Sequence, residues 1–116
     1  MTKETNHEIM NALMEIGIPA NLRGFPYIVY AEQLIFADQN YMHGITKALY
    51  IDIAKHFMTT PSNVERCIRT AIVIGWKVAK PETKEKIFHN TIRQGKEFPT
   101  NAHFITMLYY YITDLQ

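Results

Sequence analysis

Four polar side chains within one short stretch have the types and spacing needed to contact the bases of a DNA duplex. They are Asn63, Glu65, Arg66 and Arg69, in the run S-N-V-E-R-C-I-R. Arginine donates two hydrogen bonds to guanine O6 and N7, and a carboxylate accepts one from cytosine N4. Because an acid facing phosphates is unfavourable, Glu65 beside two arginines favours base reading over general attraction of DNA.

The same four residues also fit a simpler interpretation. Glu65 and Arg69 are four positions apart, which is the spacing of an ordinary ion pair on a solvated helix face. Such a pair contributes only about 0.2–0.5 kcal/mol to helix stability. The spacing therefore leaves both a reading face and a plain surface open.

A second group of side chains is suited to the phosphates that flank such a reading face. Hydroxyl and backbone donors at a helix N-terminus hold phosphates, and lysines position a duplex without reading it. Capping roles for the hydroxyl residues and plain surface roles for the lysines remain open beside this one. The predicted phosphate contacts are Lys47, Lys55, Thr59, Thr60, Ser62, Thr70 and Lys77.

Two helices joined by a tight turn must position these residues. At about 100° per residue, the segment after Pro61 separates into an apolar and a polar side. The apolar side holds Val64, Cys67, Ile68, Ala71, Ile72 and Gly75. The preceding segment ends in the polar break M-T-T-P, so residues 50–76 predict a helix-turn-helix, whose second helix enters the major groove.

Local signals refine this unit. Ala54 is small where a second helix must cross closely, and Val64 is the aliphatic residue ten positions later. Thr60 before Pro61 predicts an N-cap with Pro at the first helical position. Ser62 with Glu65 could form a capping box instead, which would move the helix start by two residues.

Helical periodicity extends over the rest of the chain, and no β alternation or repeat is present. We expect an all-α fold of about six helices, related to the winged-helix superfamily but without wing strands. The further helices are expected at residues 4–16, from 23 or 24 to about 41, in a short segment ending near Gly95, and at 102–115. Breaks are expected at Gly17, Pro19, His43 and Gly44.

The last of these helices is apolar almost all round. One helix at the end of a small domain rarely buries its whole circumference, so part of its surface is a candidate self-association face. That face would include Tyr109, Tyr110 and Tyr111. In the alternative interpretation the three tyrosines simply lie half exposed.

Length, charge and composition narrow the function classes. The chain has 116 residues and a formal net charge of +1, but residues 43–96 carry ten basic and four acidic side chains. Positive charge therefore gathers around the predicted reader. We expect one domain that is soluble and cytoplasmic, because the sequence has neither a membrane span nor a signal peptide.

Motifs of enzymes and metal sites do not occur in the sequence. There is no G-x-S-x-G, Walker loop or H-E-x-x-H, so no enzyme activity and no cofactor are expected. The five histidines are never four apart and have no cysteine cluster near them, which argues against a metal site. Cys67 is the single cysteine, so it cannot form an internal disulfide, and a packed thiol is expected.

Four runs of this sequence resemble a known family. E-I-G-I-P-A, G-I-T-K-A-L-Y-I-D-I-A-K, T-T-P-S-N-V-E-R-C-I-R-T-A-I and P-T-N-A-H-F-I-T-M are similar to the C-terminal DNA-binding effector domain of the master sporulation response regulator, stage 0 sporulation protein A. The similarity extends from about Glu8 to Ile112. It implies a six-helix domain that binds a TGTCGAA-like box, often as a tandem dimer, and contacts the RNA polymerase sigma subunit.

The resemblance also implies which residues read DNA and where this chain departs from the family. The family's Ser, Glu and two Arg match Ser62, Glu65, Arg66 and Arg69. Where the family typically has Arg, His and an acid, this chain has Asn63, Thr70 and Val73. Asn63 and Thr70 lie on the exposed side of the helix, so they are expected to alter phosphate affinity or part of the target sequence. No receiver domain precedes residue 1, so an excised domain or a stand-alone homologue is expected.

Two functions of different classes follow. The leading hypothesis is a sequence-specific DNA-binding transcription regulator at the nucleoid. The rival hypothesis is a helical protein-interaction module that kept the fold, lost DNA binding and docks through the tyrosine-rich last helix. The low net charge of the chain and the presence of Asn63 favour this hypothesis.

Overall fold

The chain folds into helices packed around a single hydrophobic core. The structure is a computed structural model of the chain, and it describes residues 2–44, 47–92 and 97–116. The helices are α1 (Lys3–Ile16), α2 (Gly24–Ala37), the 3-10 helix η1 (Gln39–His43), α3 (Lys47–Phe57), α4 (Pro61–Val78), α5 (Pro81–Phe88) and α6 (Asn101–Leu115). No strand occurs within the described residues, and the all-α prediction of about six helices without wing strands is confirmed.

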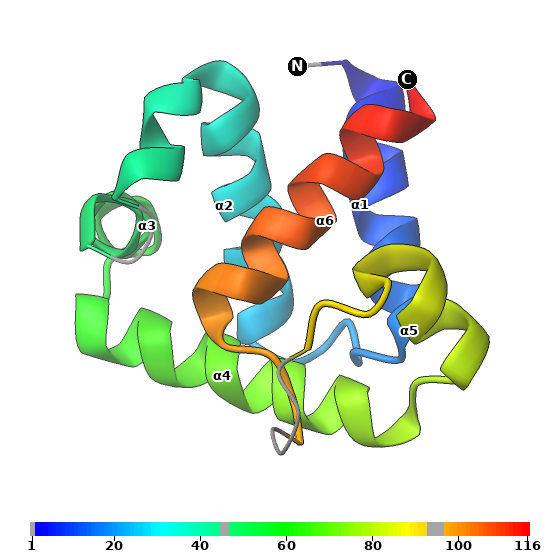
Figure 1. Cartoon of the computed structure of the whole chain (residues 1–116). Coiled ribbons are helices and arrows are strands. Elements are labelled where there is room, and N and C mark those ends of the chain that lie inside the picture. The colour runs from blue at the N-terminus through cyan, green and yellow to red at the C-terminus, as the bar shows by residue number, and fades with distance from the viewer. Residues whose placement is uncertain (1, 45–46, 93–96) are drawn as a thin grey trace.

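Helix α2 lies at the centre of this arrangement and packs against α1, α3, α4, α6 and η1. In Figure 1, α4 runs along the base of the molecule, from α3 at one end to α5 at the other. The two chain termini lie close together beside α1 (Figure 1), where the Gln116 amide donates a hydrogen bond to Glu8 over 3.3 Å. The largest fully buried side chains are Phe88, Phe104, Ile9, Leu13, Ile16, Ile18, Ile28, Ile35, Leu49, Ile53, Ile68 and Ile72.

Helix α1 begins one residue earlier than expected and ends at Ile16 as expected, whereas α2 is shorter than expected. Gly17 ends α1 in the left-handed conformation, with φ +111°, and donates to the Leu13 carbonyl. Helix α2 ends at Ala37 and not near Tyr41, because Asp38 adopts an extended conformation and accepts a hydrogen bond from the Asn40 backbone at 3.0 Å. An aspartate that bonds the backbone two residues on favours a turn over a continued helix.

The 3-10 helix that follows is attached to α3 through a side-chain contact. The Tyr41 hydroxyl donates to the Asp52 carboxylate, and this hydrogen bond raises the pKa of Tyr41 to about 12. This contact links η1 to α3, which begins at Lys47, three residues before the expected start of the helix-turn-helix.

Helices α5 and α6 differ slightly from the prediction at their ends. Helix α5 ends at Phe88 because His89 takes a positive φ of 53°, which an α-helix does not continue. The predicted end near Gly95 lies outside the described residues. Helix α6 begins at Asn101, one residue early, with Thr100 as its N-cap.

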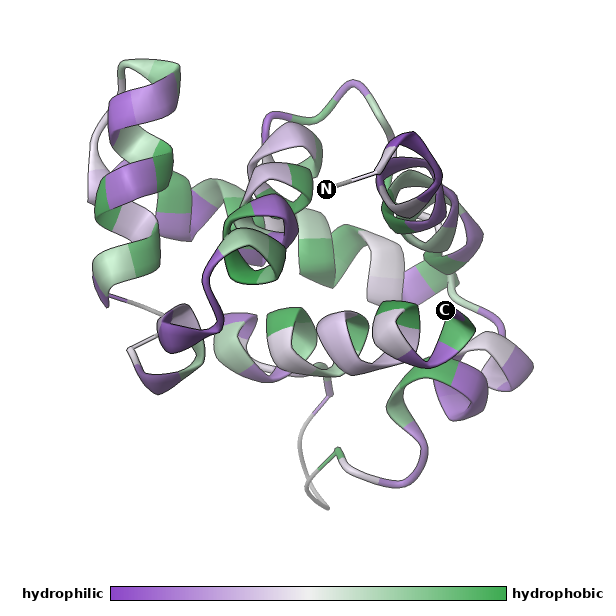
Figure 2. Cartoon of the chain, turned by 90° about the horizontal axis from the view of Figure 1, so that it is seen from above, coloured by the Kyte–Doolittle hydropathy of each residue, from purple (hydrophilic) through white to green (hydrophobic). Residues whose placement is uncertain are grey.

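Most buried side chains are hydrophobic, but Met14, Ile51 and Val78 are exposed, and Glu32 is buried within α2. Figure 2 shows hydrophilic residues spread along the helices and not confined to the connections. Within the described part of the chain, no helix combines the length and the apolar character that crossing a membrane requires.

Candidate nucleic-acid interface

Helices α3 and α4 and the three residues between them form the predicted helix-turn-helix. Ala54 and Val64 are both buried, as close crossing of two helices requires. The Thr59 backbone donates to the Ala54 carbonyl at 2.9 Å and closes the turn. Thr60 is the N-cap, because its side chain accepts from the Asn63 backbone at 3.1 Å. The alternative start at Ser62 is not used, since Ser62 already lies within α4.

The turn contains a residue whose backbone conformation suits glycine better. Met58 has φ +56° and its side chain is 92% exposed, so it is conformationally unfavourable and makes little packing contact. Replacing Met58 with Gly is expected to raise the free energy of unfolding by about 0.5–1 kcal/mol. Urea denaturation checks this, with Met58→Ala as the control, because Ala removes the same side chain but keeps Cβ. Equal stabilities of the Gly and Ala variants would contradict the explanation.

The polar face of α4 carries the four predicted base-reading residues. Val64, Ile68, Ala71 and Ile72 are buried on the opposite face. Arg66 is exposed, and the side chains of Glu65 and Arg69 retain 38% and 48% of their accessible surface. Asn63 is half-buried at the edge of the face. From Asn63 to Arg69 the helix rises only about 9 Å, which lies within the width of a major groove.

These side chains are partnered with one another in the free protein. Arg66 donates from Nη2 to Asn63 Oδ1 at 2.6 Å, and Asn63 donates from Nδ2 to Thr59 Oγ1 at 2.9 Å. Glu65 and Arg69 form an ion pair one turn apart. Exposed pairs of this kind contribute little to stability, so they can be exchanged for contacts to DNA at low cost.

The residues predicted to contact phosphates surround this face, but they differ in exposure and in the hydrogen bonds that they already make. Lys47 and Lys55 are exposed on α3, and Ser62, Thr70 and Lys77 are exposed on α4. Thr60 is exposed but occupied as the N-cap, and Thr59 is half-buried and holds Asn63. Lys77 lies about 12 Å along the helix beyond Arg69, too far to share a base pair with it.

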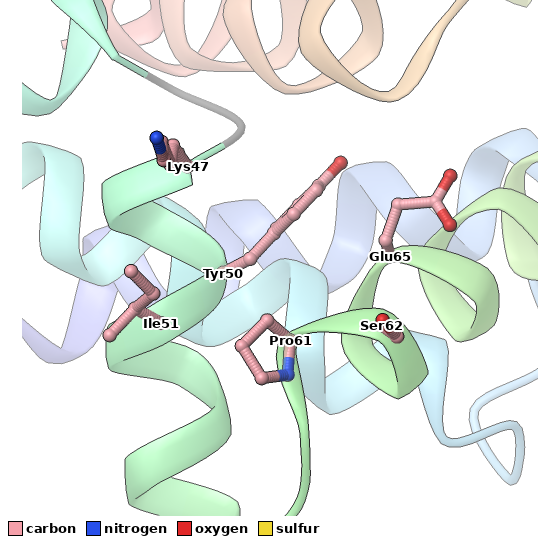
Figure 3. Close-up of a pocket in the computed structure, with 6 residues that line it drawn as sticks. All are labelled: Lys47, Tyr50, Ile51, Pro61, Ser62 and Glu65. Atoms are coloured by element: carbon pink, nitrogen blue, oxygen red, sulfur yellow. The ribbon is translucent and has the colours of Figure 1, made fainter.

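A pocket separates α3 from the first turn of α4 (Figure 3). Lys47, Tyr50 and Ile51 line it from α3, and Pro61, Ser62 and Glu65 line it from α4. In Figure 3 the Tyr50 ring extends from α3 toward α4, with its hydroxyl end on the side of Glu65. The pocket therefore lies beside the reading face. Two residues that are predicted to contact phosphates, Lys47 and Ser62, both line it.

Two residues that sequence reasoning did not select support this face from behind. The Asn101 side chain, at the start of α6, donates to the Tyr50 hydroxyl at 2.9 Å and to the Glu65 backbone carbonyl at 3.0 Å. Burial raises the pKa of the Tyr50 hydroxyl, so this group remains protonated. The run F-P-T-N before α6 is typical of a helix N-cap, but no local pattern pointed to partners on α3 and α4.

The three tyrosines of α6 do not share one surface. Tyr109 is 7% exposed and packs against Phe36, with ring centroids 4.8 Å apart. Tyr110 is 56% exposed, and Tyr111 is half-buried with the Lys86 ammonium 5.9 Å from its ring centroid. Tyr109 therefore belongs to the core, and only Tyr110 and Tyr111 remain for a surface contact.

Metal-ligating residues do not cluster anywhere in the part of the chain that the structure describes. Cys67 is a half-buried free thiol on α4, and its sulfur lies 3.6 Å from Asn63 Oδ1. The expected packed thiol thus also contacts the edge of the reading face.

The chain was compared with models of known protein families. A family model described as "Sporulation initiation factor Spo0A C terminal" matches residues 9–112. The matched region includes every residue of α3 and α4 and ends within α6.

Proposed function

The chain belongs to the family of Spo0A C-terminal effector domains, which bind DNA and regulate transcription, and from this premise we propose that it reads a short TGTCGAA-like box through α4. The family is not an enzymatic one, in agreement with the absence of catalytic motifs from the sequence. The observation that carries the proposal is the composition of one exposed face, which holds two arginines and a glutamate within about 6 Å along the helix axis.

In this proposal each reading residue has a distinct role. Arg66 and Arg69 donate to guanine O6 and N7, and Glu65 accepts from cytosine N4. Asn63 has an amide suited to adenine N6 and N7, the pairing that asparagine commonly makes. A TGTCGAA-like box contains guanine, cytosine and adenine, so each of these residue types has a suitable base within it.

Phosphate contacts would fix the domain on the duplex without reading sequence. Lys47 and Lys55 on α3, with Ser62 at the start of α4, flank one side of the reading face. Lys77 lies on the last turn of the same helix, and Thr70 lies between. The residues on the α3 side of the reading face and those farther along α4 would contact the DNA backbone on either side of the major groove. This binding would take place in the cytoplasm, at the nucleoid.

Selection from a pool of random duplexes tests this proposal directly. The expected outcome is enrichment of one short motif related to TGTCGAA. The salt dependence of binding to the selected duplex is a second measurement, in which log K is expected to fall by about 0.9 per phosphate contact for each unit of log salt concentration. A pool without any enriched motif, together with salt-independent binding, would refute DNA reading.

A second candidate function has support from the surface of α6. Tyr110 and Leu115 are exposed apolar residues, and they line a shallow groove between α5 and α6 together with Met107. Such a surface suits a protein partner: a second copy on a tandem site, the RNA polymerase sigma subunit, or the partner of a module that has lost DNA binding. Sedimentation of the complex on a two-box duplex tests the first of these partners, because one chain per duplex would exclude the tandem dimer.

A further inference from the structure

We propose that Asn101 is a positioning residue for base recognition, which fixes the reading face of α4 against α3 and α6. This inference rests on the proposed function, because it concerns how accurately Glu65 and Arg69 meet their bases. Asn101 itself does not contact DNA in this proposal and acts through the main chain of α4.

The geometry of the amide supports this role. Asn101 is 8% exposed and uses both N–H groups of its amide, one to the Tyr50 hydroxyl at 2.9 Å and one to the Glu65 carbonyl at 3.0 Å. These partners lie 51 and 36 positions earlier in the sequence and belong to the two helices of the helix-turn-helix. One buried side chain therefore links α3, α4 and α6.

The attachment point on α4 explains why recognition should be sensitive to this link. Glu65 and Arg69 lie one turn apart on α4, and both line a cleft that Asn101 and Tyr50 also line. A bidentate base contact tolerates only small errors of position, and buried partners fix such positions better than solvated ones. Asn101 holds the helix at the residue where reading takes place.

The chemistry of the site requires the amide and not merely a polar residue. An aspartate has the same shape but no N–H donor, so it can only accept from the Tyr50 hydroxyl. Its carboxylate would face the Glu65 carbonyl oxygen without a proton between them. Asn101→Asp therefore breaks the link to α4 while it preserves the side-chain volume.

The test compares binding of wild type and variants to the selected box and to a scrambled duplex. Asn101→Asp is expected to lower the ratio of the two affinities about tenfold, which corresponds to loss of accurate placement of one bidentate contact. The ratio cancels the general effect of the added negative charge. Tyr50→Phe, which keeps the ring and cuts only the α3 link, is expected to lower the ratio about threefold.

Thr100→Ala is the matched control for simple destabilisation of α6. It removes the N-cap of the same helix, whose hydroxyl accepts from His103 N at 3.1 Å, and leaves both Asn101 bonds in place. We expect this control to lower the thermal midpoint but to leave the affinity ratio unchanged. Backbone ¹⁵N relaxation of residues 65–69 in the free protein is expected to show greater mobility in Asn101→Asp only.

The outcomes separate this inference from the proposed function. If wild type discriminates and the Asp and Phe variants discriminate equally well, the positioning role is overturned and the proposed function stands. Equal loss of the ratio in Thr100→Ala also overturns it, because the effect would then follow from stability alone. If wild type itself shows no preference for any sequence, the proposed function fails and this inference fails with it.

Discussion

Replacing Glu32 with Leu is expected to raise the free energy of unfolding at pH 7 by about 2–4 kcal/mol. Glu32 lies in the middle of α2, has no exposed surface, and neither of its carboxylate oxygens has a hydrogen-bond partner within the described residues. Burial raises its pKa well above the ordinary value of 4.5, because the charged form is poorly solvated there. Leucine removes this cost and is close to glutamate in volume.

The same carboxyl predicts how stability varies with pH. Since the folded state binds the proton more tightly than the unfolded chain, the stability that depends on the neutral carboxyl is complete below pH 4.5 and is lost as pH rises toward the folded pKa. Over that interval the free energy of unfolding falls by about 1.4 kcal/mol per pH unit for this group. Urea denaturation from pH 5 to pH 8 measures the slope.

Two further variants make the measurement specific. Glu32→Gln removes the charge but leaves a polar amide buried, so its stability is expected to lie between those of wild type and Glu32→Leu. Glu4→Gln changes an exposed carboxylate in the first turn of α1 and is expected to leave the slope unaltered. Parallel pH profiles for wild type and Glu32→Leu would contradict the assignment to Glu32.

The burial of Glu32 illustrates what the sequence could not supply. The apolar residues after Arg23 predicted a helix, and α2 lies at the centre of the fold. The partly exposed side of α2 is also largely apolar, with Val29, Tyr30, Leu34 and Phe36 half-buried, so no polar stripe shows where a single charged residue should lie. Periodicity therefore predicted the element, and only the packing of distant helices determined the environment of Glu32.

The exposed face of α4 could be predicted from the sequence because, in contrast to α2, this helix has clearly separated apolar and polar sides. Helix α4 has one buried and one polar side, so a 3.6-residue period was sufficient to place Val64 and Ile68 inside and Arg66 outside. Helix α6 is apolar all round, and its period could not decide that Tyr109 would face the core and Tyr110 the solvent. Asn101 was missed because its partners are remote in sequence, a property that no local pattern encodes.

Arg66→Ala and Arg69→Ala are each expected to lower the preference for the selected box over a scrambled duplex by about 5- to 150-fold, the equivalent of 1–3 kcal/mol per bidentate contact. Truncation leaves a guanine edge without its donors, so the loss should appear at one base position for each arginine. Competition binding against duplexes with single base changes measures it.

Lysine variants are the control for loss of positive charge. Lys55 and Lys77 are exposed beside the reading face and would contact only phosphates. Lys55→Ala and Lys77→Ala are expected to weaken binding to both duplexes equally and to reduce the salt slope by about 1 each. If the arginine variants behave in the same way as the lysine variants, α4 attracts DNA without reading it.

Glu65 decides between the two interpretations of the exposed face. The ion pair with Arg69 contributes about 0.2–0.5 kcal/mol, less than a base contact, so DNA can displace it. If Glu65 accepts from cytosine, Glu65→Gln lowers the preference at one C·G pair. If Glu65 only restrains Arg69, the same variant frees the arginine and removes a negative charge, and affinity for both duplexes rises while the preference stays the same. Because the two interpretations predict opposite changes in affinity for the selected box, one variant measured on two duplexes distinguishes them.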